Sequence, residues 1–600
     1  MLSSPQQAEI IQSPLESQCI LAGPGSGKTY VLTQRIISLL ERNLIRGTHC
    51  LALTFGVSAS LELRNRIHGA LGRATSSMVT VKTIHALCLS ILKKHDPSYV
   101  FRELCQNKEQ IESIVDSSIA PFYTMPAFPK EATDPEKALW IAHQCLRCQP
   151  QELMHPNSCS WEIIITKAIM HGFAQQNLFL FDFLCFDACV LLKKENIFLP
   201  YTAVFVDEFQ DLTPTQFAFI ACLTPPASSF LTIVGDPNQS IYGWRGSSPE
   251  LFERACTHHP NMKTYHLSQT FRCPQNIMAT ANILIANNPN PSATHVQTEI
   301  PAGIVSIHRY SSIQEELSKT ASRISTWLDQ EIPPSSIAVF ARTSELVQQS
   351  MLFFHNNGLP IQGENPLAQK EGKQMLSLLN FLHDGSQLEN AINIGRRRVR
   401  STTYRQLIAR DSTSSLEKQL RDLCTSHPAH YPEVEEFLAG IDAFSYNTDN
   451  LVESLSLLFK MLKFPTEHSD IPAQDNVLAV AALTLNIAQS APSLPYIIDT
   501  LTDFKSHSFE DRNSILVTTL HKSKGLEFSH VCILGNQNNI FPHVGLTKND
   551  AVALAEERRL LYVGITRSKQ ELHLSNHSAP QNNSFSQRDG FLHELAPYIG

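Results

Sequence analysis

Residues 22–29 carry side chains that could hold the phosphates of a nucleotide. They read Ala-Gly-Pro-Gly-Ser-Gly-Lys-Thr, after an apolar run at 19–22 and before a stretch at 30–40 with helical spacing. In such a strand–loop–helix unit the glycines let backbone N–H groups turn onto phosphates, and the helix N-terminus adds positive potential. Lys28 can reach the β- and γ-phosphates, and Thr29 can ligate Mg²⁺. The loop therefore predicts a nucleoside triphosphate site, although by itself it does not separate a kinase, a GTPase, a transporter ATPase and a helicase.

An acidic segment follows a second apolar run and could complete this site. Residues 203–206 (Ala-Val-Phe-Val) are typical of a buried strand, and Asp207 and Glu208 follow directly. A carboxylate at the end of a neighbouring strand holds Mg²⁺ beside a phosphate-binding loop, so we predict that role for Asp207. Glu208 is then placed to orient and deprotonate the attacking water. The alternative is a solvated acidic loop at a strand end, because acidic turns are common.

A third apolar run, at 231–234, leads into a loop with a different set of side chains. Gln239 lies just past the strand and could sense the γ-phosphate during hydrolysis. Tyr242, Trp244 and Arg245 follow it, and two aromatic rings beside a cation form a candidate platform for stacking nucleic-acid bases. Alternatively, the two aromatic side chains fill core, as aromatic residues usually do. The surrounding Gly, Ser and Pro residues favour the loop.

Taken in order, these motifs resemble those of the UvrD/Rep/PcrA group of superfamily 1 helicases. The three segments are GPGSGKT at 23–29, VDEFQD at 206–211 and GDPNQSIYGWRG at 235–246. Further segments similar to motifs of the group lie at 4–7 (SPQQ), 51–67 (LALTFGVSASLELRNRI), 83–85 (TIH), 269–272 (QTFR), 337–360, 519–528 (TLHKSKGLEF) and 556–568 (EERRLLYVGITRS). The resemblance therefore extends along almost the whole chain.

The resemblance implies an ATP hydrolase whose site lies between two RecA-like domains and is complete only when they close on each other. Glu208 and Gln239 are the implied catalytic residues of the first domain. Arg272 and Arg567 are the implied arginine fingers of the second, because a guanidinium fork stabilises charge on the transferred phosphoryl group. ATP and Mg²⁺ are therefore the expected cofactors.

The resemblance also implies a set of binding residues around ATP. Gln7 would read adenine, Phe271 would stack on it, and Glu527 would bond the ribose. Thr29 and Asp207 are the implied metal ligands. The full set of implied ATP-binding residues is Gln7, Ala22, Gly23, Pro24, Gly25, Ser26, Gly27, Lys28, Thr29, Phe271, Arg272, Glu527 and Arg567.

For the DNA strand, the resemblance points to five residues, namely Phe55, His85, Tyr242, Trp244 and Arg245. One departure from the family pattern concerns the segment after Phe55. The family usually carries Asn-Lys-Ala-Ala after its Thr-Phe pair, whereas Val57 and Ser58 replace the Asn and the Lys here. One phosphate contact is then lost or moved. Phe271 replaces a usual Tyr, which keeps the stacking face and loses a hydroxyl.

The motif order predicts an α/β fold with two RecA-like P-loop domains, in which parallel sheets are flanked by helices and each domain has a mainly helical insertion. The expected domains are 1–85 with 181–270 (1A) and 271–383 with 508–600 (2A), and the insertions are 86–180 (1B) and 384–507 (2B). The second insertion begins with an arginine cluster, Arg396 to Arg400. This cluster either binds duplex phosphates or is a solvated helix end, and the sequence does not decide between them.

Composition adds broad limits. The 600 residues are 42% hydrophobic and 17% charged, which is globular, and the net charge of −8 is only weak evidence against a nucleic-acid partner. The most apolar stretch, 178–192, is interrupted by Asp182 and Asp187, and the N-terminus lacks the pattern of a secretory signal. The 14 cysteines lack a four-ligand zinc spacing and are expected to be reduced thiols. We therefore expect a cytoplasmic protein, nucleoid-associated if bacterial, with no membrane partner.

The expected function is an ATP-dependent DNA helicase. It would translocate on single-stranded DNA, 3′ to 5′ by family resemblance, and unwind duplex DNA in repair, replication or recombination. Its partners would be single-stranded and partly duplex DNA. The alternative is a single-strand translocase or ATPase subunit of a larger repair or defence complex, with a repair or nuclease partner protein and weak unwinding of its own.

Overall fold

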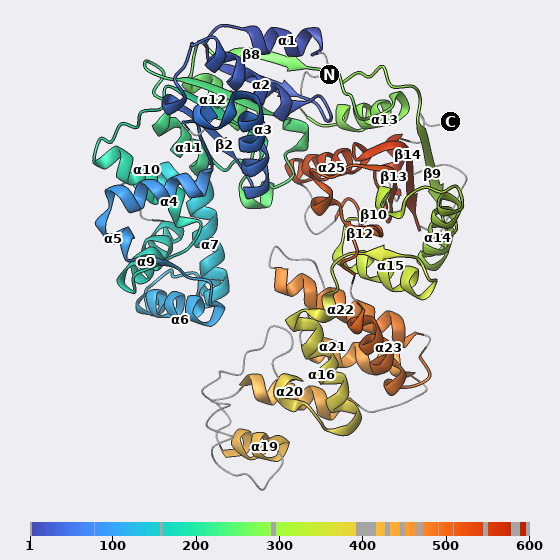
Figure 1. Ribbon diagram of the computed structural model, residues 1–600. Helices are drawn as coiled ribbons and strands as arrows, with labels where there is room; N and C mark the ends of the chain where they lie inside the picture. Colours follow the sequence, from blue (N-terminus) through green and yellow to red (C-terminus); the bar gives the residue numbers. More distant parts are fainter. Residues whose placement is uncertain are drawn as a thin grey trace. The chain divides into compact units, whose positions relative to one another are not determined.

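The computed structural model describes most of the chain, and its elements are drawn in Figure 1. The described residues are 3–76, 78–155, 160–289, 296–391, 416–426, 432–444, 450–462, 464, 472–489, 491–507, 509–543, 550–577 and 589–595. The chain folds into two compact units. The first comprises Met1–Met278 and Ile285–Ile300, and the second comprises Ala279–Leu284 and Pro301–Gly600.

The first unit is built on a six-stranded parallel sheet. Across the sheet the strands are β3 (Thr80–Thr83), β2 (Cys50–Thr54), β6 (Ala203–Val206), β7 (Phe230–Gly235), β1 (Gln18–Ala22) and β8 (Lys263–Leu267). The apolar runs predicted as strands at 203–206 and 231–234 fall in β6 and β7. Both strands are buried almost throughout, as expected for a parallel sheet covered on both faces.

Parallel pairing places the loops that carry the predicted site residues at one edge of this sheet. Leu21 of β1 pairs with Gly235 of β7, and Leu53 of β2 pairs with Val206 of β6, while β6 pairs in parallel with β7, so the carboxyl ends of these four strands lie at one edge of the sheet. Ligands of open parallel sheets bind outside the carboxyl ends of the strands. The loops that follow β1, β2, β6 and β7 therefore form the edge at which a site is expected.

One set of helices covers this sheet, and a second set forms a separate helical group beside it (Figure 1). The helices that follow the sheet strands or precede the first of them are α1 (Pro5–Gln12), α2 (Lys28–Glu41), α3 (Val57–Ser76), α11 (Pro214–Leu223) and α12 (Leu251–His258). The helical group contains α4 (Ile84–His95), α5 (Pro97–Val100), α6 (Lys108–Ile119), α7 (Pro135–Cys148), α8 (Pro150–Met154), α9 (Trp161–Gln175) and α10 (Phe183–Lys194), with a short pair of strands, β4 (Glu103–Leu104) and β5 (Leu178–Phe179). The described cysteines are free thiols, and Cys148 is the exposed one among them.

The second unit repeats the parallel architecture. Its strands lie in the order β11 (Ile361–Gln362), β12 (Ile515–Thr519), β10 (Ile337–Ala341), β13 (Phe528–Ile533), β14 (Ser568–Asn576) and β9 (Ile304–Arg309), and all pairs are parallel. Helices α14 (Ile313–Asp329), α15 (Ser344–Asn356) and α25 (Ala551–Ile565) accompany this sheet, and α13 (Gln275–Ala286) lies where the chain passes between the units. The predicted α/β class with helix-flanked parallel sheets is confirmed.

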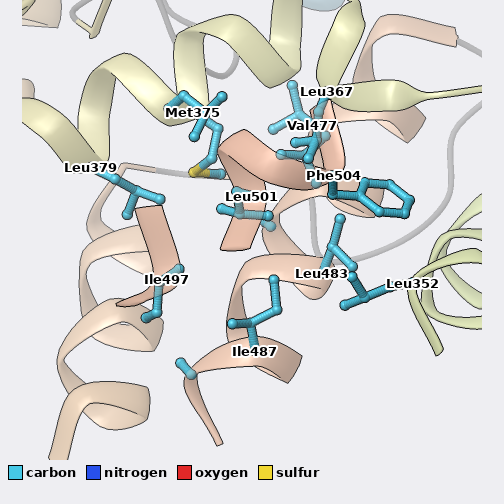
Figure 2. Packing of buried hydrophobic residues seen from close by; sticks show 14 of the residues in the cluster. Leu352, Leu367, Met375, Leu379, Val477, Leu483, Ile487, Ile497, Leu501 and Phe504 are labelled. Atoms are coloured by element: carbon cyan, nitrogen blue, oxygen red, sulfur yellow. The ribbon is translucent and has the colours of Figure 1, made fainter. Parts of the chain in front are cut away.

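A second helical group shares its core with the second sheet. It comprises α16 (Lys370–Asp384), α17 (Leu388–Ala391), α19 (Leu416–Ser426), α20 (Pro432–Ala443), α21 (Leu451–Met461), α22 (Pro472–Ala488) and α23 (Leu494–Ser506), and a last short helix, α26 (Leu592–Leu595), lies near the end of the described chain. Figure 2 shows Leu352 of α15 in the same apolar cluster as Met375, Leu483 and Phe504 from α16, α22 and α23. The arginine cluster at 396–400 lies outside the described residues. The domain boundaries drawn from the motif order stay predictions.

Within the described part of the chain, no helix has both the length and the apolar character needed to span a membrane.

Candidate active site

The loop between β1 and α2 has the backbone geometry of a phosphate-binding loop. Gly25 and Gly27 have φ values of 68° and 82°, in the left-handed region that side chains rarely adopt. A Cβ on Gly25 would also lie 2.6 Å from the Thr270 hydroxyl oxygen, so the loop has no room for one. Helix α2 begins at Lys28, which turns its N-terminal N–H groups toward the loop.

Side-chain hydrogen bonds to backbone carbonyl groups stabilise this loop. The Lys28 ammonium donates to the carbonyl oxygens of Ala22 (3.4 Å) and Gly23 (3.2 Å), and the Ser26 hydroxyl donates to that of Gly23 (2.8 Å). The Gln7 amide nitrogen donates to the Ser26 carbonyl (2.9 Å). Gln7 is itself fixed by a capping box at the start of α1. The predicted adenine reader is therefore anchored against the phosphate loop.

Thr29 and Asp207, the two predicted metal ligands, meet. The Thr29 hydroxyl donates to a carboxylate oxygen of Asp207 at 2.9 Å. Burial, and then the charge of neighbouring Glu208, raises the pKa of Asp207 to about 7. A buried carboxylate beside a second carboxylate is stabilised by a cation, and a hydroxyl with a carboxylate is an oxygen donor set that suits Mg²⁺. The residues present therefore fit this metal.

Glu208 is held in an uncommon backbone conformation. Its φ of 51° is positive, and its N–H donates to the Asp207 carboxylate at 2.9 Å. A non-glycine residue in the left-handed region costs energy and recurs at functional sites. Its carboxylate accepts a hydrogen bond from the Gln210 side-chain amide. The backbone of Glu208 and its carboxylate are thus each held by a hydrogen bond, the first to Asp207 and the second to Gln210.

A chain of hydrogen bonds joins Glu208 to Gln239, the predicted γ-phosphate sensor. Gln210 bridges two segments, because its amide nitrogen donates to Glu208 and its amide oxygen accepts from the Asp236 N–H (3.0 Å). The Asp236 carboxylate accepts from the Gln239 amide at 2.7 Å. Sequence reasoning did not single out Gln210 or Asp236. The sequence pointed to these two residues only in that each lies within a motif identified above.

Phe271 and Arg272 lie in the first compact unit, next to the phosphate loop, whereas the resemblance implied that the second domain supplies them. The Phe271 N–H donates to the Gly25 carbonyl (3.0 Å), and the Arg272 N–H donates to the Thr270 hydroxyl (3.3 Å). A Cβ on Gly25 would lie 2.5 Å from the Arg272 Cβ, so the two segments are in close contact. The Phe271 ring is exposed, as a side chain that stacks on a base would be.

Glu527 and Arg567 lie in the second unit and are neighbours there. Arg567 is only 2% exposed, and its guanidinium donates to the carbonyl oxygens of Val563 (2.9 Å) and Leu526 (3.2 Å). Glu527 is exposed and forms an ion pair with Lys569 at 2.8 Å. The structure therefore brings the phosphate loop, Asp207, Glu208, Gln239 and Arg272 together in one unit and Glu527 with Arg567 in the other.

The aromatic residues predicted to bind DNA form a cluster. The rings of Phe55 and Tyr242 are nearly parallel, with an interplanar angle of 5° and centroids 6.4 Å apart. Trp244 lies edge-on to Tyr242, with centroids 6.5 Å apart. The Arg245 guanidinium carbon lies 4.6 Å from the Trp244 ring centroid and 5.5 Å from that of Tyr242. Phe55 and Trp244 are both exposed, so this platform faces solvent rather than core.

His85, the fifth predicted DNA-binding residue, pairs with a different ring. Its imidazole packs on Phe181, with centroids 4.2 Å apart. Phe181 is exposed and was not predicted from the sequence, which offered no motif for it. Val57 and Ser58, which depart from the family pattern, begin α3 and are both exposed. Val57 is 70% exposed, so an apolar side chain occupies a solvent position beside the platform.

Comparisons with known proteins find similarity along almost the whole chain. A family model described as the UvrD/REP helicase N-terminal domain matches residues 3–260, and one described as the UvrD-like helicase C-terminal domain matches residues 265–491 and 486–579. DNA helicase II of Escherichia coli (strain K12) is 27% identical over 624 residues, covering 95% of this chain and 84% of that protein. ATP-dependent DNA helicase PcrA of Bacillus subtilis (strain 168) is 25% identical over 635 residues, with coverages of 96% and 82%. ATP-dependent DNA helicase UvrD1 of Mycobacterium leprae (strain TN) is 26% identical over 676 residues, with coverages of 99% and 86%.

Proposed function

Because the chain belongs to the UvrD/REP helicase family, which supports ATP-dependent DNA helicase activity, we propose that it translocates 3′ to 5′ on single-stranded DNA and unwinds duplex ahead of it. One observation carries the ATP-driven translocation in this proposal, and the polarity rests on the family resemblance. The hydrogen-bonded chain from Glu208 to Gln239 ends in the same loop that carries Tyr242, Trp244 and Arg245. This chain of hydrogen bonds supports a link between the γ-phosphate and the side chains that we propose contact a DNA strand.

The proposed hydrolysis uses the residues around the phosphate loop. Lys28 and the N-terminus of α2 hold the phosphates. Thr29 and Asp207 would hold Mg²⁺, whose charge would offset that of the phosphates. Glu208 takes a proton from the attacking water, and its fixed orientation favours one water position.

The remaining predicted residues complete the proposed site. Arg272 and Arg567 stabilise charge on the transferred group, and Gln239 detects its departure. Gln7 and Phe271 contact the base and Glu527 the ribose, as the family resemblance implies. The resemblance implies that domains 1A (1–85 with 181–270) and 2A (271–383 with 508–600) carry the two halves of the site, although Arg272 lies with the phosphate loop in the first compact unit. In this proposal Arg567 is the residue that the second unit contributes to hydrolysis.

The proposed DNA contacts are mainly stacking contacts. Phe55, Tyr242 and Trp244 offer ring faces to bases, and Arg245 adds a cation beside them. His85, whose ring packs on Phe181, contributes a polar contact to the DNA strand. Stacking tolerates any base, which suits an enzyme that moves along a strand of arbitrary sequence. The substrate is DNA with a single-stranded region beside a duplex, and we expect the protein to work where DNA is, in the cytoplasm or nucleoid.

Strand displacement tests polarity and unwinding together. Duplexes with a 3′ tail, a 5′ tail or no tail are incubated with ATP and Mg²⁺. We expect displacement from the 3′-tailed duplex, little from the others, and none with Glu208→Gln. Preference for the 5′ tail would refute the polarity, and DNA-independent ATP hydrolysis would refute the helicase assignment itself.

A second candidate is a translocase that unwinds poorly without a repair or nuclease partner. The exposed Val57 and Ser58 favour it, because the family usually has a polar Asn and a cationic Lys there. This candidate predicts DNA-stimulated ATP hydrolysis and displacement of a bound protein such as streptavidin from a single strand, with little duplex unwinding. Efficient unwinding by the isolated chain would eliminate it.

A further inference from the structure

Two histidines and an aspartate from distant parts of the chain meet in the second unit. His355 lies in the last turn of α15, Asp503 lies in the last turns of α23, and His507 directly follows α23. One potential ligand atom from each of the three side chains lies within 4.8 Å of the other two. The two imidazole rings have centroids 4.2 Å apart and are inclined by 65°. The three side chains therefore form a group that could hold one metal ion.

The tautomer of His507 suits a metal ligand. Its Nδ1 lies 2.9 Å from the backbone carbonyl oxygen of Asp503. A carbonyl oxygen only accepts, so Nδ1 carries the hydrogen and Nε2 keeps its lone pair. Metal-binding histidines usually have this arrangement, with the second ring nitrogen donating to a carbonyl or carboxylate that fixes the ring.

The end of α23 is itself held in place. The Asn365 side-chain amide donates to the carbonyl oxygens of Phe504 (3.0 Å) and Lys505 (3.3 Å), and its oxygen accepts from the Leu367 N–H (3.0 Å). Phe504 points into the apolar cluster shown in Figure 2, as does Leu352 of α15, one turn before His355. Both backbones are therefore positioned by packing that does not depend on an ion.

The surroundings also favour a cation at this point. The carboxyl end of a helix carries partial negative charge, and Asp503 adds a full one. The rings of Phe504 and Phe509 flank His355 at centroid distances of 5.9 and 5.7 Å and limit the positions its imidazole can take. Asp503 and His507 are exposed, so an ion can enter from solvent.

We propose that His355, Asp503 and His507 form a binding site for a divalent transition-metal ion of the Zn²⁺ class, with solvent completing the coordination. Two imidazoles and one carboxylate suit zinc and its neighbours, whereas Mg²⁺ and Ca²⁺ prefer all-oxygen sites. The site is separate from the Mg²⁺ site at Thr29 and Asp207 and goes beyond the proposed helicase function. A bound ion would join α15, which flanks the second sheet, to the end of α23 in the helical group.

Zinc titration of the chelator-treated full chain tests the site. Isothermal titration calorimetry is performed with Zn²⁺ on the wild type and on His355→Ala, Asp503→Ala and His507→Ala. We expect one binding event that weakens at least about 10-fold in each variant, since loss of even an outer partner of a ligand costs about 10–100-fold in affinity. Zn²⁺ should also raise the melting temperature of the wild type and not of the variants. Asp503 is exposed, so its variant remains informative even if His355→Ala folds poorly.

His383→Ala is the matched control, because His383 is an exposed histidine at the end of α16 in the same unit. It should bind Zn²⁺ like the wild type. Co²⁺ substitution reports the ligands, because nitrogen and oxygen ligands give only visible d–d bands whereas a thiolate adds a near-ultraviolet charge-transfer band. Equal Zn²⁺ affinity in all four variants and the wild type, a thiolate band, or no binding event would each overturn the proposal.

Discussion

Replacing Trp244 with alanine separates a DNA-stacking role from a structural one. Trp244 is 37% exposed, its ring centroid lies 4.6 Å from the Arg245 guanidinium carbon, and its backbone carbonyl accepts a hydrogen bond from the Gln144 amide at 3.1 Å. The substitution removes the ring and keeps the backbone bond. Stacking of one base on an aromatic ring contributes about 1–3 kcal/mol, so we expect single-strand affinity to fall about 5- to 150-fold.

Two further readouts give this prediction its specificity. The slope of log affinity against log salt should not change, because no phosphate contact is lost. DNA-stimulated ATP hydrolysis should fall while basal hydrolysis is kept, because Gln239 is anchored to Asp236 independently of the ring. Fluorescence anisotropy with a labelled oligonucleotide at several salt concentrations and a coupled ATPase assay measure both.

Trp140→Ala is the control for loss of a tryptophan as such. Trp140 is 45% exposed on α7 in the same unit and belongs to no motif. It should leave affinity and stimulation unchanged. If Trp244 instead filled core, its removal would cost about 3–5 kcal/mol of stability. A marked fall in melting temperature with joint loss of basal and stimulated activity would refute the stacking assignment.

Three other substitutions test the site and the fold. Lys28→Ala should abolish ATP hydrolysis and keep nucleotide-free DNA binding, and hydrolysis near the wild-type rate would contradict the phosphate site. Arg567→Lys should lower kcat by about 10³–10⁵-fold if Arg567 is an arginine finger. It should also lower the melting temperature, because the guanidinium is buried and donates hydrogen bonds to the carbonyl oxygens of Val563 and Leu526. Unchanged turnover would contradict the catalytic role. Burial raises the pKa of Asp187 from 3.8 to about 6, so the folded chain loses stability relative to the unfolded one as pH rises from about 4 to 6. Asp187→Asn should therefore gain up to about 3 kcal/mol over the wild type between pH 4 and pH 7 in urea denaturation, and a difference independent of pH would contradict this.

Local patterns predicted the fold class and the strands that position the site. The runs at 203–206 and 231–234 are short, apolar and followed by turn residues, so strand and loop were both determined by neighbouring residues. The contact between Thr29 and Asp207 could also be expected from the sequence. Each follows a strand of a parallel sheet, and carboxyl ends of such strands share an edge.

Side-chain contacts between segments could not be predicted in this way. Gln210 and Asp236 lie within identified motifs, but which polar group each would bond depends on the register of β6 and β7. The cluster of His355, Asp503 and His507 had no signal at all, because α15 and α23 are far apart in sequence and meet only through the shared apolar core. Tertiary packing, rather than spacing along the chain, creates both features.

Val57 and Ser58, at the exposed start of α3, carry no charge that could attract the proposed DNA strand to a chain whose net charge is −8. The proposed DNA platform consists of the rings of Phe55, Tyr242 and Trp244 with Arg245, and Ser58 stands where the family usually has a lysine. Ser58→Lys should therefore add one phosphate contact and steepen the slope of log affinity against log salt by about 0.7 on single strands. Ser318→Lys, at an exposed position of α14 in the second unit, changes net charge equally and should leave the slope as it was. Equal slopes for both variants would mean that position 58 does not face the DNA backbone, and that the aromatic platform binds the strand in another register.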